Sequence, residues 1–221
     1  TCPRKTKLRA FKRIEARAVA RHDFALKYDA EGGYLGTEVS GEKLLEASKF
    51  DKILILRNNG IYTIIPLPDK FFAGQKLLWT AIAKKESLSK TTITLIYSLS
   101  GENGAYIKRT IIDSWLTGRD YSLLPETAVI LGFSTASEFD FKLEYKPKSR
   151  SKKTYEVFHA KNYTVRNRSA QGIKLTDREI IRFEILTTQE SDNKRKQEDL
   201  DASTAHISKK KPNREARSKK E

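Results

Sequence analysis

The stretch Lys52-Ile-Leu-Ile-Leu-Arg-Asn-Asn-Gly-Ile-Tyr-Thr-Ile-Ile65 predicts the fold class of the whole chain. Two short runs of apolar, largely β-branched residues flank Asn58-Asn59-Gly60. An Asn-Gly pair supplies the positive φ angles of a type I′ turn, whose twist matches that of paired antiparallel strands. The stretch therefore predicts a β-hairpin that turns at Asn59-Gly60.

Three further hairpins of the same plan are predicted along the chain. Their strands are apolar runs on either side of a polar turn: residues 24–28 and 34–39, 92–97 and 106–112, and 141–145 and 155–158. A tyrosine lies at or near the start of every return strand, namely Tyr34, Tyr62, Tyr106 and Tyr155. These rings could stack on nucleic-acid bases, but an aromatic residue that recurs at one repeat position is more typical of packing between repeats.

Single strands are predicted after the hairpins, at residues 76–82, 128–133, 172–175 and 179–186. Gly60 and Gly104 are 44 residues apart, and the next turn, near Ser151, follows 47 residues later. That spacing is typical of a propeller-type blade of about four strands. Gly33 precedes Gly60 by only 27 residues. The first repeat is therefore expected to lack its third strand, with about one helical turn at residues 40–48.

The sequence predicts three regions. Residues 1–23 are a basic connector, either a short helix or an extended arm, and residues 24–187 are the all-β blades, about three to four in number. Residues 188–221 contain almost nothing apolar and are predicted to be a disordered tail with a basic end. The sequence contains no Met, which predicts that it is a piece of a longer protein.

The net charge of +15 is unevenly distributed. Residues 24–139 hold 13 basic and 13 acidic side chains, whereas residues 140–187 hold 12 basic and 6 acidic ones. Such asymmetry predicts a polyanionic partner rather than a uniformly solubilising surface.

Signals of catalysis are weak. No glycine-rich run ends in Gly-Lys-Ser or Gly-Lys-Thr, as a phosphate-binding loop requires. His22, His159 and His206 are far apart, and Cys2 is the single cysteine, so neither a metal site nor a disulfide is predicted. A lone cysteine is typical of a reducing compartment. No apolar run approaches the roughly 18–20 residues of a membrane-spanning helix.

Basic residues recur at related positions of successive repeats, which predicts a positive track for a phosphate backbone. An isolated basic turn is as often merely solvated. The candidate DNA-binding residues are Lys108, Arg109, Arg119, Lys146, Lys148, Arg150, Lys152, Lys153, Arg166, Arg168 and Lys174. We expect Lys108, Arg109, Arg166 and Arg168 to lie on the solvent side of their blades.

Several segments resemble the C-terminal domain of bacterial gyrase and topoisomerase IV A subunits. Gly104-Ala-Tyr-Ile-Lys-Arg-Thr-Ile-Ile112 is similar to a return strand of that family, and Arg168-Ser-Ala-Gln-Gly-Ile-Lys-Leu175 resembles a loop-to-strand passage. Phe50-Asp-Lys-Ile-Leu-Ile55 and Pro68-Asp-Lys-Phe-Phe-Ala-Gly-Gln-Lys-Leu-Leu78 are similar to one topoisomerase IV branch, as is the opening Pro3-Arg-Lys-Thr6. The paired-glycine loop of gyrase is absent, and residues 166–172 are its nearest counterpart, which favours topoisomerase IV.

The resemblance implies a β-pinwheel, a propeller-like ring or spiral of blades with duplex DNA bending around a basic rim. It implies a non-catalytic domain of a type II topoisomerase in the bacterial cytoplasm, associated with the nucleoid. ATP and Mg²⁺ would be used by the parent enzyme outside this chain. The implied partners are duplex DNA, the breakage-reunion core of the same polypeptide and the ATPase subunit, with no membrane. The alternative is a protein-interaction module whose basic tail contacts nucleic acid.

Overall fold

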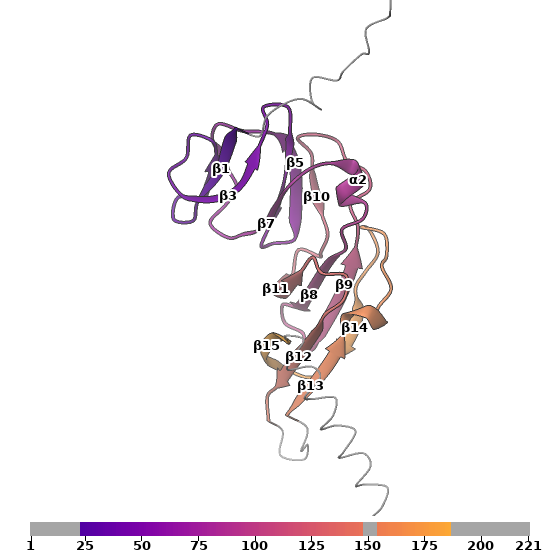
Figure 1. Cartoon of the computed structure of the whole chain (residues 1–221). Helices are drawn as coiled ribbons and strands as arrows, with labels where there is room; N and C mark the ends of the chain where they lie inside the picture. Colours follow the sequence, from indigo (N-terminus) through magenta and orange to yellow (C-terminus); the bar gives the residue numbers. More distant parts are fainter. Residues whose placement is uncertain (1–22, 148–153, 187–221) are drawn as a thin grey trace, which may run out of the picture. The chain divides into compact units, whose positions relative to one another are not determined.

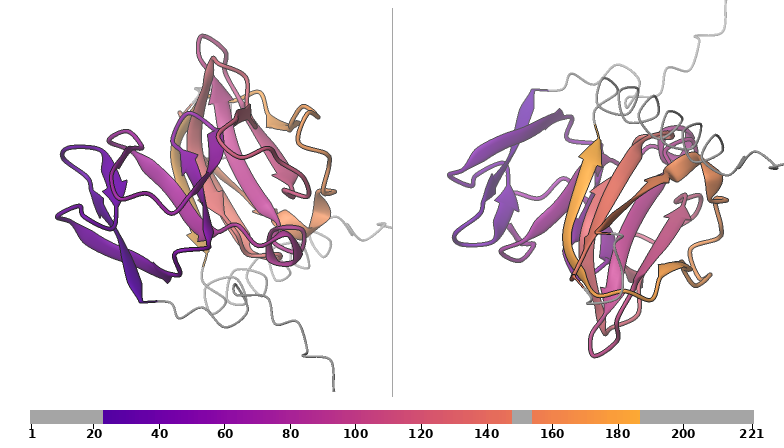
Figure 2. Two further views of the ribbon diagram at one scale, coloured as in Figure 1. Left: turned by 90° about the horizontal axis from the view of Figure 1, so that it is seen from above. Right: turned by 90° about the horizontal axis from the view of Figure 1, so that it is seen from below.

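The computed structural model describes residues 23–147 and 154–186, which form four antiparallel sheets (Figures 1 and 2). Sheet A has the order β3 (Glu42–Ala47), β1 (Phe24–Asp29), β2 (Tyr34–Gly36) and β6 (Phe71–Phe72). Sheet B has the order β10 (Asp120–Ser122), β5 (Ile61–Pro66), β4 (Lys52–Arg57) and β7 (Leu77–Ile82). Sheet C has the order β11 (Ala128–Ser134), β8 (Ile93–Leu99), β9 (Ala105–Thr110) and β14 (Ile173–Thr176). Sheet D has the order β13 (Tyr155–His159), β12 (Asp140–Tyr145) and β15 (Ile180–Leu186).

The all-β class and the four predicted hairpins are confirmed. Each hairpin contributes two paired strands to one sheet, and the strand that follows it in the repeat pairs with the first hairpin strand. The helical content of the described residues is small, a four-residue helix α2 (Lys85–Leu88) and a 3-10 turn at Ala160–Asn162. The predicted connector and tail lie outside the described residues, apart from Asp23.

Three of the sheets are completed by a strand from the following repeat. β6, β10 and β14 lie in the connections after the next hairpins, yet they pair with β2, β5 and β9. The sequence did not predict β6 and β10, because two or three residues are too few to show a periodic pattern. Within the first unit, this strand exchange adds main-chain hydrogen bonds to the packing between successive sheets.

Two local expectations were wrong. Residues 42–47 form strand β3 rather than a helical turn, so the first sheet does have its third strand. The turn at Asn58-Asn59-Gly60 is also different, because Gly60 N–H donates to the carbonyl of Arg57 at 3.0 Å and Gly60 has a φ of +76°. A three-residue loop that ends in a left-handed glycine fits these values better than a two-residue type I′ turn.

The chain divides into two compact units. The first contains sheets A, B and C and includes residues 165–177, and the second contains sheet D. In the first unit, Ile53 and Ile55 of β4 pack in a cluster with sheet A, and Leu54 and Leu56 pack in a cluster with sheet C. Alternate residues of a strand point to opposite faces, so sheet B is buried on both faces.

The second unit has its own small core. Phe141 is fully buried and stacks on Phe158 with 5.4 Å between ring centroids. Lys142 lies between Glu144 and Glu184 at 2.7 and 2.8 Å, and these carboxylates raise the pKa of Lys142.

Candidate nucleic-acid interface

One irregular segment of the first unit, residues 165–172, lies against sheets B and C, and we call it the strap. Its start is fixed to β9, because Arg166 N–H donates to the carbonyl of Arg109 at 2.8 Å. Its middle is a turn in which the Asn167 side chain accepts from Ser169 N–H at 2.7 Å and the Asn167 carbonyl accepts from Ala170 N–H at 3.1 Å. An Asn that bonds the backbone two residues ahead is typical of such turns.

Arg168 attaches the strap to sheet B. Its guanidinium donates to the Tyr62 hydroxyl at 3.2 Å and to the carbonyl of Ser114 at 2.9 Å. The same group lies over the ring of Tyr121, 4.4 Å from the centroid, and Tyr121 stacks on Tyr62 at 5.2 Å. Hydrogen bonding to Tyr62 raises the pKa of Arg168, so this side chain is a charged, half-buried link between the strap and the sheet.

Lys108 attaches the strap to sheet C. This β9 lysine is 5% exposed, and its ammonium donates to the carbonyls of Leu123 at 2.5 Å and Arg168 at 2.6 Å. Burial lowers the pKa of Lys108 to about 8, which still leaves most of the population charged at pH 7. A buried ammonium is tolerated only where acceptors replace its water, and here two main-chain carbonyls do so.

The far end of the strap packs against Tyr97 of β8. A Cβ atom added at Gly172 would lie 2.5 Å from the Tyr97 hydroxyl oxygen and 2.9 Å from its ring, so any larger residue there would force the buried Tyr97 side chain to move. Burial raises the pKa of Tyr97, and a hydrogen bond from the Gly172 backbone opposes that shift.

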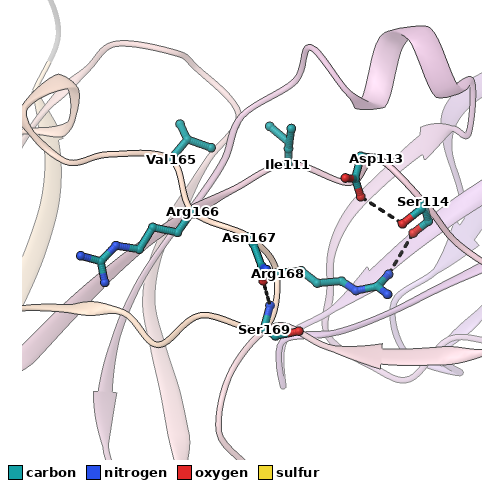
Figure 3. A pocket seen from close by; sticks show the side chains of 8 residues that line it. All are labelled: Ile111, Asp113, Ser114, Val165, Arg166, Asn167, Arg168 and Ser169. Carbon is teal, nitrogen blue, oxygen red and sulfur yellow. Dashed lines mark hydrogen bonds between the residues drawn. The ribbon is translucent and has the colours of Figure 1, made fainter.

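The outer side of the strap borders a polar groove. One hollow of about 430 Å³ is lined by residues 111, 113–114 and 165–169, and a neighbouring one of about 460 Å³ by residues 114–116, 119, 121–122 and 168–169. Figure 3 shows the side chains of Arg166 and Arg168 extending in opposite directions from the strap, with Arg168 directed toward Ser114. Arg119 and Arg166 are both exposed at this groove, which makes them available to an anionic ligand.

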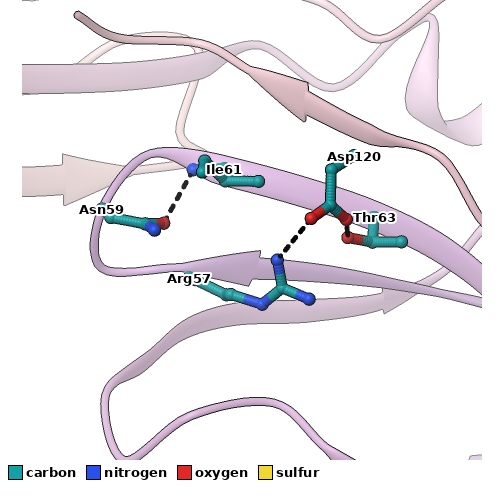
Figure 4. A network of polar contacts seen from close by, with 5 residues as sticks. All are labelled: Arg57, Asn59, Ile61, Thr63 and Asp120. Carbon is teal, nitrogen blue, oxygen red and sulfur yellow. Dashed lines mark hydrogen bonds and ion pairs between the residues drawn. The ribbon is translucent and has the colours of Figure 1, made fainter. Parts of the chain in front are cut away.

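The groove's other wall, the connection from residue 111 to residue 122, is held to sheet B by polar contacts. Asp120 accepts from the Thr63 hydroxyl and from the Arg57 guanidinium, the latter at 3.2 Å (Figure 4). Lys52 donates to the Thr117 hydroxyl at 2.7 Å. Both walls of the groove are therefore fixed to the sheets by their own hydrogen bonds.

The predicted site residues divide by burial. The predicted solvent-side placement of Lys108 and Arg109 is wrong, because they are 5% and 7% exposed. Arg119, Lys146, Arg166 and Lys174 are exposed, and Arg168 is half-buried. Lys146 pairs with Glu179 at 2.9 Å, and Lys174 pairs with Asp177. Lys148, Arg150, Lys152 and Lys153 lie outside the described residues, and a DNA contact by any of these side chains stays a prediction.

Arg166 and Arg168 line one hollow of the groove, and Arg119 and Arg168 line the other. The structure adds groove residues that the sequence did not suggest, chiefly Ser114 and Tyr121. Of the four repeated tyrosines, Tyr62 is fully buried and Tyr106 stacks on Tyr97 at 5.4 Å, in line with packing. Tyr34 and Tyr155 are 37% and 44% exposed. Tyr34 still packs edge-on against Phe72 of β6, with 5.5 Å between ring centroids, so the packing interpretation extends to a partly exposed ring.

Within the described residues no group of His, Cys, Asp and Glu side chains is suited to hold a metal ion. In the same residues no helix is long and apolar enough to cross a membrane.

The described part of the chain is an all-β array of hairpin-based sheets with an arginine-bordered groove, and comparison with known proteins gives its family. The family model described as topoisomerase C-terminal domain, Bacteroidota, matches residues 25–188, and the chain belongs to this family. It is 29% identical over 132 residues to the A subunit of DNA topoisomerase 4 from Borreliella burgdorferi, a match that covers 59% of this chain. The aligned part is 21% of that relative's length.

A crystal structure of the C-terminal domain of DNA topoisomerase IV is also similar, with a TM-score of 0.49 and 14% sequence identity. That match covers 71% of this chain and 59% of the other. The predicted family is confirmed by the family model and the curated relative.

Proposed function

We propose that this domain binds and bends duplex DNA for a topoisomerase IV-type enzyme. The observation that carries the proposal is the groove beside the strap, where exposed Arg119 and Arg166 border hydrogen-bonded walls. Guanidinium groups bind phosphate through planar, charge-assisted hydrogen bonds. Walls fixed beforehand reduce the ordering cost of binding.

The expected binding has little sequence preference. A recognition helix in the major groove is excluded for the described residues, because their α-helix, α2, has only four residues. Contacts to phosphates alone give affinity without sequence information. Contact with about six phosphates would lower the affinity on the order of a thousandfold between 50 and 200 mM salt.

Titration of the whole chain on a random 40-base-pair duplex at several salt concentrations tests this. The second candidate, a protein-interaction module with a DNA-contacting tail, places the binding elsewhere. Two triple variants separate them: Arg119→Gln, Arg166→Gln and Lys174→Gln in the first unit, and Lys209→Gln, Lys210→Gln and Lys211→Gln in the tail. We expect the first triple to lower the slope of log affinity against log salt by roughly 3, and the second to change it less. The reverse order would favour the interaction module.

The proposed bend is modest. Bending a site of 20–30 base pairs through 40–90° costs of order 1–6 kcal/mol, and phosphate contacts must offset it. The paired-glycine loop of gyrase has only the strap as its counterpart, so we expect little stored supercoiling. Nicked plasmid sealed with the domain bound should show a linking number close to the protein-free control. A large positive shift that grows with protein would instead indicate gyrase-like wrapping.

The remaining roles belong to the parent enzyme. Strand cleavage, ATP hydrolysis and Mg²⁺ binding would reside in the breakage-reunion core and the ATPase subunit, and the domain would present one duplex to that core. With such partners, the protein would work in the bacterial cytoplasm, at the nucleoid.

A further inference from the structure

Lys108 joins two segments that are far from it in the sequence. Its ammonium is within 2.6 Å of the carbonyl oxygens of Leu123 and Arg168, so one buried cation bridges the strap and the residue that directly follows the 111–122 connection. Leu123 in turn donates its N–H to the carbonyl of Gly60 at 2.9 Å. The bridge therefore reaches from sheet C through the connection to the hairpin of sheet B.

We propose that Lys108 is a positioning residue for DNA binding, which holds the strap in the place that presents Arg166 at the groove. The proposal rests on the proposed function, and it assigns Lys108 a role without contact to DNA. A side chain that is 5% exposed has no surface to offer a phosphate. Its effect on DNA must pass through the backbone that it holds.

The strap's geometry makes this transmission direct. Arg166 is two residues before the carbonyl that Lys108 binds, and Arg166 N–H is fixed to β9 through the carbonyl of Arg109. Arg168 supplies the carbonyl that Lys108 binds, and its guanidinium donates hydrogen bonds to Tyr62 and Ser114. Without Lys108, the Arg168 carbonyl loses its ammonium donor in a half-buried site, and the strap keeps its other contacts only.

A neutral side chain of similar length isolates this role. Lys108→Met retains most of the buried stem but cannot donate to either carbonyl. We expect duplex affinity to fall about tenfold, and the slope against log salt to fall by roughly 1 to 2, because one or two phosphate contacts are lost. Hydrogen exchange at the Arg166 and Ala170 amides should accelerate, because both bonds depend on a docked strap.

Combination with Arg166→Gln distinguishes positioning from general weakening. If Lys108 acts through the strap, the double variant Lys108→Met with Arg166→Gln binds about as weakly as Lys108→Met alone, since residues that act as a unit are not additive. Leu95→Val is the matched control, because Leu95 pairs with Lys108 across the β8–β9 ladder and is also buried. Leu95→Val should lower the stability of the fold and leave the slope of log affinity against log salt, here called the salt slope, unchanged.

The outcomes are separable. If the unaltered chain does not bind duplex DNA, the proposed function fails and this inference fails with it. If the unaltered chain binds and Lys108→Met binds equally well, or if the two substitutions add fully, only the inference is overturned. Should Lys108→Met fail to fold, Lys108→Gln keeps an amide donor for one carbonyl, and the same slope and exchange measurements apply. A Lys108→Gln protein whose Arg166 and Ala170 amides exchange faster but whose salt slope is unaltered would overturn the inference, because the strap would be loosened without any loss of phosphate contact.

Discussion

Lys108 on β9 and Arg166 on the strap carry the same charge and lie close together, yet their surroundings are opposite. Lys108 is enclosed by carbonyl oxygens, whereas the Arg166 side chain is exposed beside a polar groove. The difference comes from the layers over each backbone. The strap lies against β9 and encloses Lys108, whereas Arg166 on the strap itself is exposed. Whether a basic residue of this domain is structural or available to a ligand therefore depends on the segment that covers its side chain, not on its charge.

Charge reversal is the strongest test of this comparison. Lys108→Glu would place a carboxylate against two carbonyl oxygens, so acceptors would face acceptors in a buried site. We expect a loss of more than about 4 kcal/mol in the free energy of unfolding, or no folded protein. Arg166→Glu should change it by less than about 0.5 kcal/mol. Urea denaturation of both variants measures this, and equal losses would contradict the comparison.

The pH dependence of stability is the next largest effect. Lys108 has a pKa of about 8 in the folded chain and 10.5 as its reference value. Between these values the unfolded chain binds more protons, so the free energy of unfolding rises with pH. At about 1.4 kcal/mol per pKa unit, the rise is at most about 3 kcal/mol.

This window has an upper limit, because burial raises the pKa of Tyr62 and Tyr97 above 10.0. Unfolding then becomes easier above about pH 10 as the unfolded tyrosines ionise. Urea denaturation from pH 7 to 10 should show the rise in the unaltered chain and its loss in Lys108→Met. A parallel pH profile in Lys108→Met would mean that another group titrates.

The sequence predicted the long elements because each carries its own local signal. The runs around Asn58-Asn59-Gly60 have the turn and the β-branched residues that a hairpin needs, and the strand bounds agree closely with those predicted. β3 was misread, because Glu42-Lys-Leu-Leu-Glu-Ala47 consists of good helix formers whose strand state comes from pairing with β1. The exchanged strands β6 and β10 depend on partners in another repeat, which no local pattern reveals.

The groove was predicted only in part for a related reason. The sequence proposed Arg119, Arg166 and Arg168 as DNA-binding residues, and all three line the groove, but it placed Lys108 on the solvent side with Arg166 and Arg168. Adjacent strand residues point to opposite faces, so Lys108 and Arg109 could not both face solvent across one sheet face. That signal was present in the sequence. The cover over Lys108 was not, because it arrives from the strap, 60 residues later.

Arg168 is half-buried, between the buried Lys108 and the exposed Arg166, and its substitution should change the free energy of unfolding by an intermediate amount. Arg168→Gln removes the hydrogen bonds to Tyr62 and Ser114 and the contact with the Tyr121 ring. We expect a loss of about 1–2 kcal/mol in the free energy of unfolding. Arg168→Lys should recover little of it, because an ammonium lacks the planar fork that spans two acceptors and a ring. Full recovery by lysine would show that charge alone holds the strap.

The smallest expected effect separates two arginines on either side of the same groove wall. Arg57 pairs with Asp120 at 3.2 Å and is 21% exposed, whereas Arg119 is exposed beside Tyr121, 5.5 Å from the ring centroid. Arg57→Gln should lower the free energy of unfolding by up to about 1 kcal/mol, as partly exposed pairs do, and leave the DNA salt slope unchanged. Arg119→Gln should leave stability within about 0.5 kcal/mol and lower the salt slope by about 1. Because the two substitutions remove the same charge from the same wall, a simple dependence on net charge would give equal slopes. Unequal slopes would locate the phosphate contact at Arg119, and equal ones would mean that the DNA senses only the total charge of this wall.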